Sequence, residues 1–384
     1  MNRLGLLGCA AVLAALLSSA TAIAQPKVGP CPQAVDDTYV PAPPGIDVQS
    51  WIEGLEIPWS LAFLPDGQAL VSERPGRIRL IEGGRLASQP VASLAVATGG
   101  EGGLMGLAIH PAFPQAPYIY AMHTYEDGSK RANRVVRLVL DGSIARFDRV
   151  IVDGIVGGRN HNGGRIAFGP DGMLYVGTGE IFESARAQDR NDLGGKILRV
   201  TADGAIPADN PFPGSAVYSL GHRNVQGLAW HPVTRVLFAS EHGPSGEFGL
   251  RAYDEINIIR RGRNYGWPLA VGAVGDPAFV DPIAAWPQQA TPPGGAAFWR
   301  GDLFVATLRS HALLRIVVGD GPDSGPARAI ERWFADGAGN SRYGRLRDAV
   351  SGPDGALYVL TSNRDGRGSP AVGDDRILRL TAGR

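Results

Sequence analysis

The sequence predicts an all-β protein whose main domain, residues 46–384, is a six-bladed β-propeller. Three observations support this fold class. A hairpin-like motif occurs six times, the chain is rich in turn residues with 53 glycines and 29 prolines, and no convincing amphipathic helix separates the motifs. Long-period repeats of hairpins without helices between them are typical of propellers, in which each blade is a small antiparallel sheet.

Each copy of the motif joins an alternating apolar strand to a second strand rich in β-branched or aromatic residues. The turn between them contains Pro-Asp-Gly, His-Pro or a Gly-Asp equivalent, and this turn chemistry is a hairpin signal because proline presets φ and glycine takes positive φ. The copies begin at Leu61, Leu107, Ile166, Leu228, Ala297 and Ala349, which are 46, 59, 62, 69 and 52 residues apart. A four-stranded blade needs about 40–50 residues, so each interval holds one blade plus long loops, which we expect on one face. Two stacked β-sandwiches would not explain the regular repeat.

The two ends of the propeller are also predicted. The last strand, beginning at Arg376, is expected to help close the ring. Residues 25–45 are proline-rich and lack an apolar period, which predicts an extended lead segment.

The first 24 residues have the pattern of a secretory signal peptide. A basic Asn2-Arg3 precedes an apolar run from Leu4 to Leu17 and a small-x-small site at Ala22-Ile23-Ala24. We therefore expect a mature chain that starts at Gln25 and is periplasmic or secreted. A lipoprotein box ending at Cys9 lies too early in the apolar run, and no other run approaches the ~20 residues of a membrane helix.

Composition and motif content exclude several function classes. The chain is 44% hydrophobic and 19% charged, as in soluble globular proteins, and its net charge of zero implies no nucleic-acid partner. The G-x-S-x-G, P-loop, H-E-x-x-H and G-x-G-x-x-G signatures are absent, as is the alternating-acid calcium loop. After cleavage Cys31 is the one remaining cysteine, which leaves it free or paired between chains.

Three of the seven histidines lie in polar, glycine-containing loops beside a predicted blade strand. These are His161 in NHNGGR, His222 in GHRNVQG and His242 in SEHGP. Loops on one face of a propeller converge near its axis, so three such loops in successive blades indicate a candidate site. His110 and His231 precede proline in the repeated turn and are predicted to be structural, and His123 and His311 carry no functional signal.

Nearly all of the basic residues are arginines, and only three of the 37 are lysines. Codon bias explains this, unless some guanidiniums bind carboxylates or phosphates bidentately. Arg223 with Asn224 precedes a strand, Arg309 follows another, and Arg345 and Arg347 would share one side of a strand. Two guanidiniums on one side repel unless an anion lies between them; the alternative is a solvated, Asp-paired surface.

Six motifs, in order, resemble the soluble quinoprotein aldose sugar dehydrogenases, a family that includes the soluble glucose dehydrogenase using pyrroloquinoline quinone (PQQ). The likeness runs from about Leu55 to the C-terminus. It rests on GEGGLMGLAIHP, NHNGGRIAFGPDGMLYVGTGE, GHRNVQGLAWHP, SEHGP with DEIN and NYGWP, ATLRSHALLRI, and RLRDAVSGPDGALYVLT. The family fold is a six-bladed propeller.

The resemblance implies roles for individual residues. His161 matches the catalytic base that takes the proton of the sugar C1 hydroxyl, with Asn160 where the glucose enzyme has an acid. Arg223 and Asn224 match the pair that contacts the quinone. The residues implied to bind the cofactor are Glu101, His161, Arg223, Asn224, Tyr253, Arg309, Arg345 and Arg347.

Two of these implied roles depart from the family pattern. Arg309 stands where the glucose enzyme has Lys, which keeps the positive charge. Glu101 stands where relatives often have Gln, and an acid beside an anionic cofactor is expected to turn away or be protonated. Arg345 and Arg347 match the pair that grips the PQQ carboxylates, which would supply the missing anion.

The resemblance also implies calcium. Gly243 and Pro244 match residues whose backbone carbonyls bind the ion that orients PQQ. Glu241, Asp254 and Glu255 resemble acids associated with a further calcium in some aldose enzymes. An insertion at 245–253 changes the loop between these two groups.

The expected function is therefore a PQQ- and calcium-dependent aldose (glucose-type) sugar dehydrogenase that passes electrons to an external acceptor, which is a quinone, a dye or a cytochrome. It is expected to be a monomer or a homodimer with no membrane span. Two alternatives remain at this point: a calcium-dependent propeller lactonase, and a non-catalytic propeller that binds a sugar or a protein partner.

Overall fold

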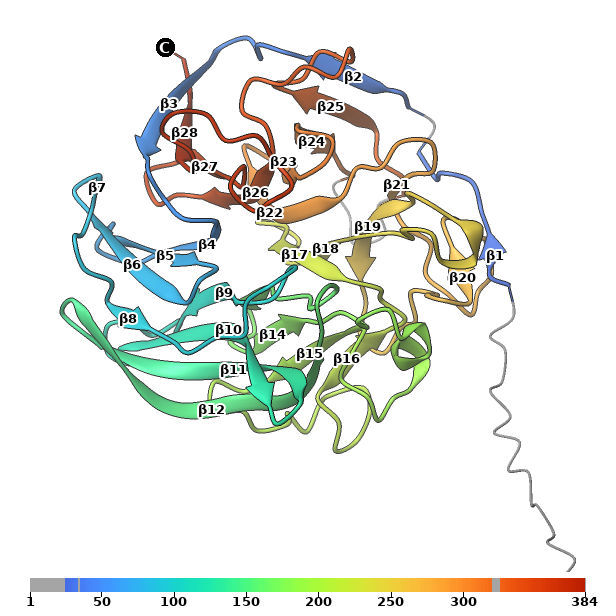
Figure 1. The fold of residues 1–384 in the computed structure, drawn as a ribbon. Coiled ribbons are helices and arrows are strands. Elements are labelled where there is room, and N and C mark those ends of the chain that lie inside the picture. The colour runs from blue at the N-terminus through green and yellow to red at the C-terminus, as the bar shows by residue number, and fades with distance from the viewer. Residues whose placement is uncertain (1–24, 34, 320–324, 384) are drawn as a thin grey trace, which may run out of the picture.

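The computed structural model describes residues 25–33, 35–319 and 325–383, and these form a ring of six blades (Figure 1). The predicted six-bladed β-propeller is confirmed. Apart from two short 3-10 helices, η1 (Ser184–Gln188) and η2 (Glu247–Gly249), the elements of the described chain are strands. The predicted signal peptide lies outside the described residues. Within them, no helix has the length and apolar character needed to cross a bilayer.

The blades follow one another along the chain, and we number them I to VI. Blade I contains β4 (Pro58–Phe63), β5 (Ala69–Glu73), β6 (Arg77–Glu82), β7 (Arg85–Leu86) and β8 (Ala92–Ser93). Blade II contains β9 (Leu104–Ile109), β10 (Tyr118–Asp127), β11 (Lys130–Asp141) and β12 (Ile144–Gly157). Blade III contains β13 (Ile166–Phe168), β14 (Leu174–Gly177), β15 (Lys196–Val200) and β16 (Val217–Leu220).

The second half of the ring has the same plan. Blade IV contains β17 (Val225–Trp230), β18 (Leu237–Glu241), β19 (Asp254–Ile259) and β21 (Ala284–Trp286). Blade V contains β22 (Pro293–Trp299), β23 (Asp302–Thr307), β24 (Leu313–Val317), β25 (Ala329–Trp333) and β2 (Asp37–Val40). Blade VI contains β26 (Leu346–Ser351), β27 (Leu357–Thr361), β28 (Ile377–Ala382) and β3 (Ile46–Ile52).

All six copies of the sequence motif form the first hairpin of a blade. In blade I, Leu61 pairs with Val71 across β4 and β5, and in blade VI Ala349 pairs with Val359 across β26 and β27. The first strands of neighbouring blades contact one another around the ring, except between blades III and IV, where β14 contacts β17. The repeated hairpin therefore builds the inner wall of the propeller.

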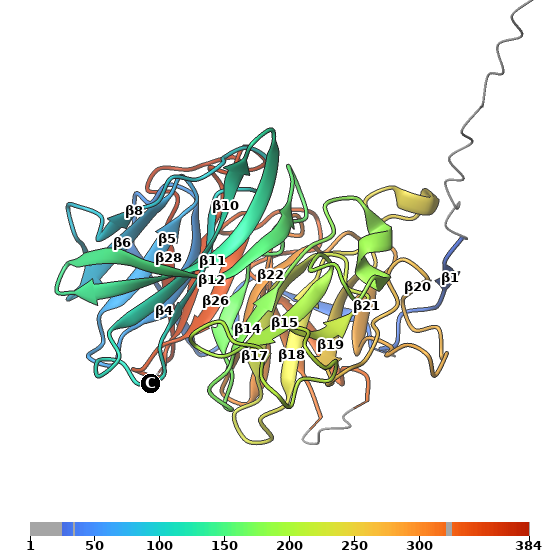
Figure 2. The ribbon, with the colours of Figure 1, turned by 90° about the horizontal axis from the view of Figure 1, so that it is seen from below.

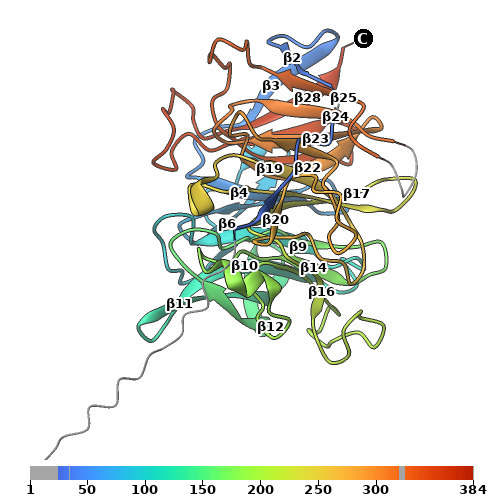
Figure 3. The ribbon, with the colours of Figure 1, turned by 90° about the vertical axis from the view of Figure 1, so that its right-hand side faces the viewer.

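The ring closes by pairing the two ends of the propeller. β3 joins blade VI antiparallel to β28, with Val48 opposite Leu380. Figure 3 shows β2 and β3 on the outside of the ring, beside β25 and β28. The expected role of the last strand in closure is confirmed.

The stretch from residue 25 to 45 lies along the outer edge of two blades. β2 extends blade V in parallel with β25, and β1 (Lys27–Val28) pairs in parallel with β20 (Ala270–Val271). Figure 2 shows β1 and β20 together at one edge of the ring. Cys31, between β1 and β2, is half-buried and forms no disulfide in the described chain.

The apolar core lies between adjacent blades. Tyr120 and Ile155 of blade II, for example, pack in one buried cluster with Val176 and Leu198 of blade III. Each blade thus buries both faces against its neighbours, which accounts for the near-continuous apolar character of the middle strands.

A buried ion pair crosses the axis of the ring. The guanidinium of Arg165, just before β13, lies 2.9 Å from Asp348 Oδ2 of β26, and it donates to the Ser60 hydroxyl of β4 and to the backbone carbonyl of Gln226 in β17. Four blades therefore meet on one side chain. Blade V approaches through Gly295, where an added Cβ would lie 1.6 Å from Asp348 Oδ1.

We expect Gly295→Ala to lower the free energy of unfolding by about 1–3 kcal/mol, the usual cost of overpacking, because the methyl group displaces Asp348 from Arg165. Thermal unfolding followed by circular dichroism measures this. Gly325→Ala is the matched control, since its Cβ meets nothing within 4 Å. Equal stability of the two variants would contradict the proposed role of the axial pair.

Candidate active site

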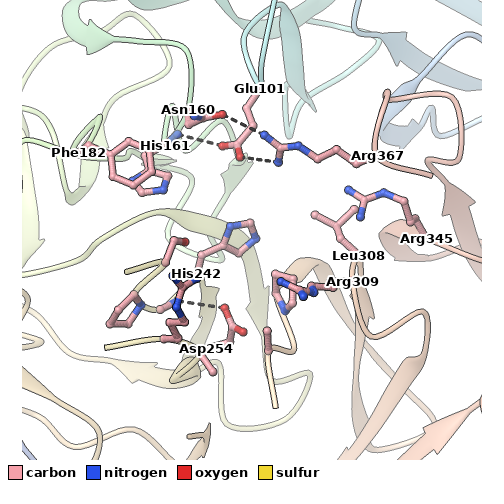
Figure 4. Close-up of a pocket in the computed structure, with 17 residues that line it drawn as sticks. Glu101, Asn160, His161, Phe182, His242, Asp254, Leu308, Arg309, Arg345 and Arg367 are labelled. Carbon is pink, nitrogen blue, oxygen red and sulfur yellow. Dashed lines mark hydrogen bonds and ion pairs between the residues drawn. The ribbon is translucent and has the colours of Figure 1, made fainter. Parts of the chain in front are cut away.

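Loops from several blades enclose a cavity of about 490 Å³ (Figure 4). Nine of the residues singled out in the sequence line it: Glu101, Asn160, His161, His242, Gly243, Pro244, Asp254, Arg309 and Arg345. The other lining residues include Phe182, Arg251 and Arg367. The cavity thus collects an imidazole pair, two carboxylates and four guanidiniums.

His161 enters the cavity from a tight loop between β12 and β13. Its φ is 55°, an uncommon conformation for a residue other than glycine. The loop packs so closely that a Cβ on Gly179 would lie 2.0 Å from the His161 carbonyl oxygen. The glycines around this histidine therefore allow β14 and the 160s loop to touch.

A buried carboxylate fixes the tautomer of His161. Nδ1 lies 2.6 Å from Oε1 of Glu180, which follows β14 and is fully buried. An ionised carboxylate only accepts hydrogen bonds, so Nδ1 carries the proton and Nε2 keeps its lone pair. The ring of Phe182 covers the imidazole at 3.8 Å between ring centroids. The hydrogen bond to Glu180 thus fixes the orientation of the His161 ring and leaves Nε2 as the nitrogen that can act as a base.

Glu101 is ionised and faces the cavity, contrary to the expectation that it would turn away or be protonated. Its Oε1 accepts from Arg367 at 3.1 Å and its Oε2 accepts from the backbone N–H of His161 at 2.9 Å. Burial favours the protonated acid, but the His242 and His161 imidazoles, the His161 N–H and Arg367 together lower the pKa of Glu101 to about 2. Arg367 also donates to Asn160 Oδ1 (Figure 4).

His242 is a structural neutral imidazole at the edge of the same cavity. Nε2 lies 2.8 Å from the Pro293 carbonyl oxygen, so it carries the proton, and Nδ1 accepts from the Asn224 amide. Burial lowers the pKa of His242 to about 3, with help from the Arg223 and Arg347 guanidiniums and against the opposing effect of Glu101.

Arg223 and Asn224 lie behind the cavity wall. Nε and Nη2 of Arg223 both bind Glu247 Oε1, at 3.0 and 2.7 Å, and Nη1 donates to the His242 carbonyl. Glu247 belongs to η2, within the loop at 245–253. Asn224 Oδ1 accepts from the backbone of Gly163, so this amide ties the His161 loop to blade IV.

Arg345 and Arg347 lie near each other at the start of β26, and of the two Arg345 lines the cavity. Strand β26 starts at Leu346, and the pairing shifts register between Leu346 and Asp348, which makes Arg347 the extra residue of a bulge. Arg345 lines the cavity and binds Asp365 through two nitrogens. Arg347 lies behind it, over the Trp59 ring, and donates to Gln226 Oε1.

A second, much smaller cavity of about 20 Å³ lies beneath Gly243 and Pro244. Glu241 and Glu255, which pair directly across β18 and β19, both line it, as does Tyr253. Burial, and then the neighbouring Glu241, raise the pKa of Glu255. The nearby Asn257 Oδ1 is buried without a hydrogen-bond partner. Two opposed carboxylates and a space large enough for one small occupant fit an oxygen-ligated cation.

Asp254 has a different place from the other two predicted acids. It lines the large cavity, and its two oxygens accept from the backbone N–H groups of Gly243 and Thr291. Burial raises the pKa of Asp254 to about 6. Asp254 therefore fixes the loop that carries Gly243.

A family model for glucose/sorbosone dehydrogenases matches residues 55–378. The chain belongs to this family. The resemblance stated from the sequence motifs is thereby confirmed.

Several named proteins are similar over most of the chain. A crystal structure from Thermus thermophilus, described as an oxidoreductase (glucose dehydrogenase), is 54% identical with a TM-score of 0.82, covering 88% of this chain and 100% of that one. The PQQ-bound aldose sugar dehydrogenase of Streptomyces coelicolor is 42% identical with a TM-score of 0.77, covering 88% and 99%. Aldose sugar dehydrogenase YliI of Escherichia coli is 31% identical over 357 residues, which is 85% of this chain and 92% of that protein.

Sequence reasoning missed several members of this dehydrogenase site. Glu180, Phe182, Glu247, Asp365 and Arg367 all contact predicted site residues. Glu180 had a signal, because it is an acid directly after a hairpin strand and ends the motif that begins at Asn160. Arg367 and Asp365 lie in a loop with no such pattern, and only the folded ring brings them to Glu101 and Arg345.

We expect His242 to make this dehydrogenase less stable in acid than at neutral pH. An unfolded histidine takes up a proton below about pH 6.5, whereas folded His242 stays neutral down to about its lowered pKa of 3. The free energy of unfolding should therefore fall as the pH drops through this window. Urea titrations of calcium-free protein at pH 7 and pH 4.5 measure it. His242→Gln should be less stable at pH 7 but lose less between the two pH values; an equal loss would contradict the assignment.

Proposed function

We propose that this family member is a PQQ- and calcium-dependent dehydrogenase that oxidises the C1 hydroxyl of an aldose to the lactone. The proposal follows the names of its relatives, among them the PQQ-bound enzyme of Streptomyces coelicolor. It extends to glucose-type sugars as substrates, and the pocket-lining loops would decide which sugar fits. An external quinone, dye or cytochrome would accept the electrons.

The observation that carries the proposal is an excess of positive charge at the cavity. Four guanidiniums and two carboxylates lie close enough for their charges to interact: those of Arg74, Arg345, Arg347 and Arg367, and those of Glu101 and Asp365. Four guanidiniums against two carboxylates leave a surplus of two positive charges. Arg309 adds another, because it lines the cavity and the described residues offer it no acidic partner. A bound tricarboxylate would offset this excess.

PQQ fits the residues that surround the cavity. Its carboxylates would be held by Arg345 and Arg309 directly, with the buried charge of Arg347 behind them. Burial lowers the pKa of Arg347 to about 10, which still leaves it a cation at neutral pH. When bound, PQQ supplies the acceptor for the hydride that leaves the sugar.

His161 supplies the base. Its Nε2 lone pair would take the proton of the C1 hydroxyl, while C1 loses hydride and the C–O bond becomes a carbonyl. Glu180, bound to Nδ1, would stabilise the imidazolium that forms and keep the ring in place. Phe182 would exclude water from this face of the imidazole.

The calcium assignment follows from the smaller cavity. Backbone carbonyls of Gly243 and Pro244 would hold one ion at the larger cavity, and Glu241 with Glu255 would hold a second beneath them. An ion there would neutralise two carboxylates that otherwise repel each other across β18 and β19.

The two alternatives account for less of the structure. A propeller lactonase would need free acids at the axis, whereas Asp348 there is occupied by Arg165. A non-catalytic propeller would have no use for the His161–Glu180 pair. Neither explains the surplus of arginines.

The direct test is dye reduction by the purified protein with a panel of aldoses, with and without PQQ and calcium. We expect turnover only when both are added. Absence of turnover, together with no change in PQQ absorbance on titration, would return the function to the alternatives.

His161→Ala should abolish this turnover, by at least about 100-fold for a lost general base, while PQQ still binds. Arg345→Ala should instead weaken PQQ binding, because it removes a direct partner of the carboxylates. Absorbance titration and dye reduction separate the two effects. Full turnover in His161→Ala would show that the base is another residue.

A further inference from the structure

Three side chains beside the cavity lie close together, and the proposed reaction has no role for one of them. One ligand atom each of His161, Glu180 and Glu247 lies within 4.8 Å of the other two. The three come from separate segments: the loop before β13, the end of β14 and the helix η2. Of the three, only Glu247 is partly exposed, so the group is reached from the side of the 245–253 loop.

One of these carboxylates is incompletely satisfied. Oε1 of Glu180 binds His161, but Oε2 is buried and has no hydrogen-bond partner. A buried carboxylate oxygen without a partner loses its hydration without replacement. The second oxygen of Glu180 therefore indicates a missing cationic or donor partner at this position.

The charges of the group also call for a cation. Glu180 and Glu247 are two carboxylates, and Arg223 is the one guanidinium that binds either of them among the described residues. Arg223 pairs with Glu247, so the carboxylate of Glu180 has the His161 imidazole beside it but no guanidinium partner among the described residues. This is the opposite of the arginine-rich side of the cavity, so the two sides would select ligands of opposite sign.

We propose that His161, Glu180 and Glu247 bind a first-row divalent ion such as Zn²⁺, and that this ion inhibits the enzyme. An imidazole nitrogen with two carboxylates is a ligand set suited to Zn²⁺, with solvent completing the coordination. Calcium prefers all-oxygen sets such as the one at Glu241 and Glu255. Zinc bound at Nδ1 would release to solvent the proton that Nδ1 now shares with Glu180, and the metal-bound ring would be a weaker base at Nε2 for the proposed oxidation.

Zinc binding to the metal-stripped, PQQ-free protein tests the site without any turnover. Isothermal titration with Zn²⁺ alone, and the visible absorption spectrum with Co²⁺ alone, should each report one ion per chain. Glu247→Gln should weaken zinc binding by about tenfold or more, and His161→Ala should do the same. Glu183→Gln is the matched control, because Glu183 is an exposed acid three residues from Glu180 that binds Arg186 instead.

Circular dichroism of each variant checks that the fold is kept. The two substituted residues lie in different loops, so a local structural defect is not expected to affect both variants in the same way. Zinc binding of wild-type strength in both His161→Ala and Glu247→Gln would overturn the proposal. So would the absence of stoichiometric zinc binding, or displacement of zinc by an equal concentration of calcium, which would place the ion at the calcium ligands.

The inhibitory part is tested separately in the PQQ- and calcium-loaded protein. Stoichiometric zinc should lower the rate at which the wild-type protein reduces the dye at least tenfold. Each variant is compared with its own zinc-free rate, and the loss of rate should be much smaller in Glu247→Gln than in Glu183→Gln. Equal inhibition of the two would overturn the inhibitory role. The binding titrations need neither quinone nor sugar, so their failure leaves the proposed dehydrogenase activity untouched.

Discussion

The ion pair between Arg165 and Asp348 is the contact on which the geometry of the ring depends. Both side chains are buried, and Arg165 also binds Ser60 and the Gln226 carbonyl, so blades I, III, IV and VI share one guanidinium. A buried pair is costly to break because the remaining charge is left unpaired. Arg165 directly follows the glycines of the His161 loop, so the contact that holds the blades together also fixes where the catalytic loop starts.

Bulges in the inner strands bring side chains from three blades together near this axis. The pairing of the first hairpin shifts register between Pro58 and Ser60 in blade I, between Val225 and Gly227 in blade IV, and between Leu346 and Asp348 in blade VI. The extra residues are Trp59, Gln226 and Arg347, and these three meet, with Arg347 over the Trp59 ring and bonded to Gln226. Regular alternation would have pointed such side chains elsewhere, so the bulges re-aim them.

The sequence was sufficient for the hairpins because turn chemistry and alternation are local. It was also sufficient for the resemblance, whose motifs contain His161, Arg345 and the Gly243-Pro244 turn. It was insufficient for the bulge at Arg347, because nothing in the residues 345–348 marks a bulge locally. It was equally insufficient for β2, which adds to blade V by pairing with a strand near the other end of the chain. The pairing of Glu101 with Arg367 could not be predicted either, because only ring closure brings these two residues near each other.

The loop at 245–253 joins the arginine Arg223 to the catalytic histidine through Glu247. Its carboxylate holds Arg223, the residue that matches the family's quinone contact, and it also lies beside His161 and Glu180. Arg223 is buried, and Glu247 offsets its positive charge. The part of that charge that acts on the cavity is the part that Glu247 does not offset. The electrostatic environment of the catalytic histidine therefore depends on the position of one short loop. Because η2 packs its Phe248 against Trp267, that position is set by apolar contact as well as by charge. The 245–253 loop therefore determines how far Arg223 adds to the positive charge that the other arginines supply near the reacting groups.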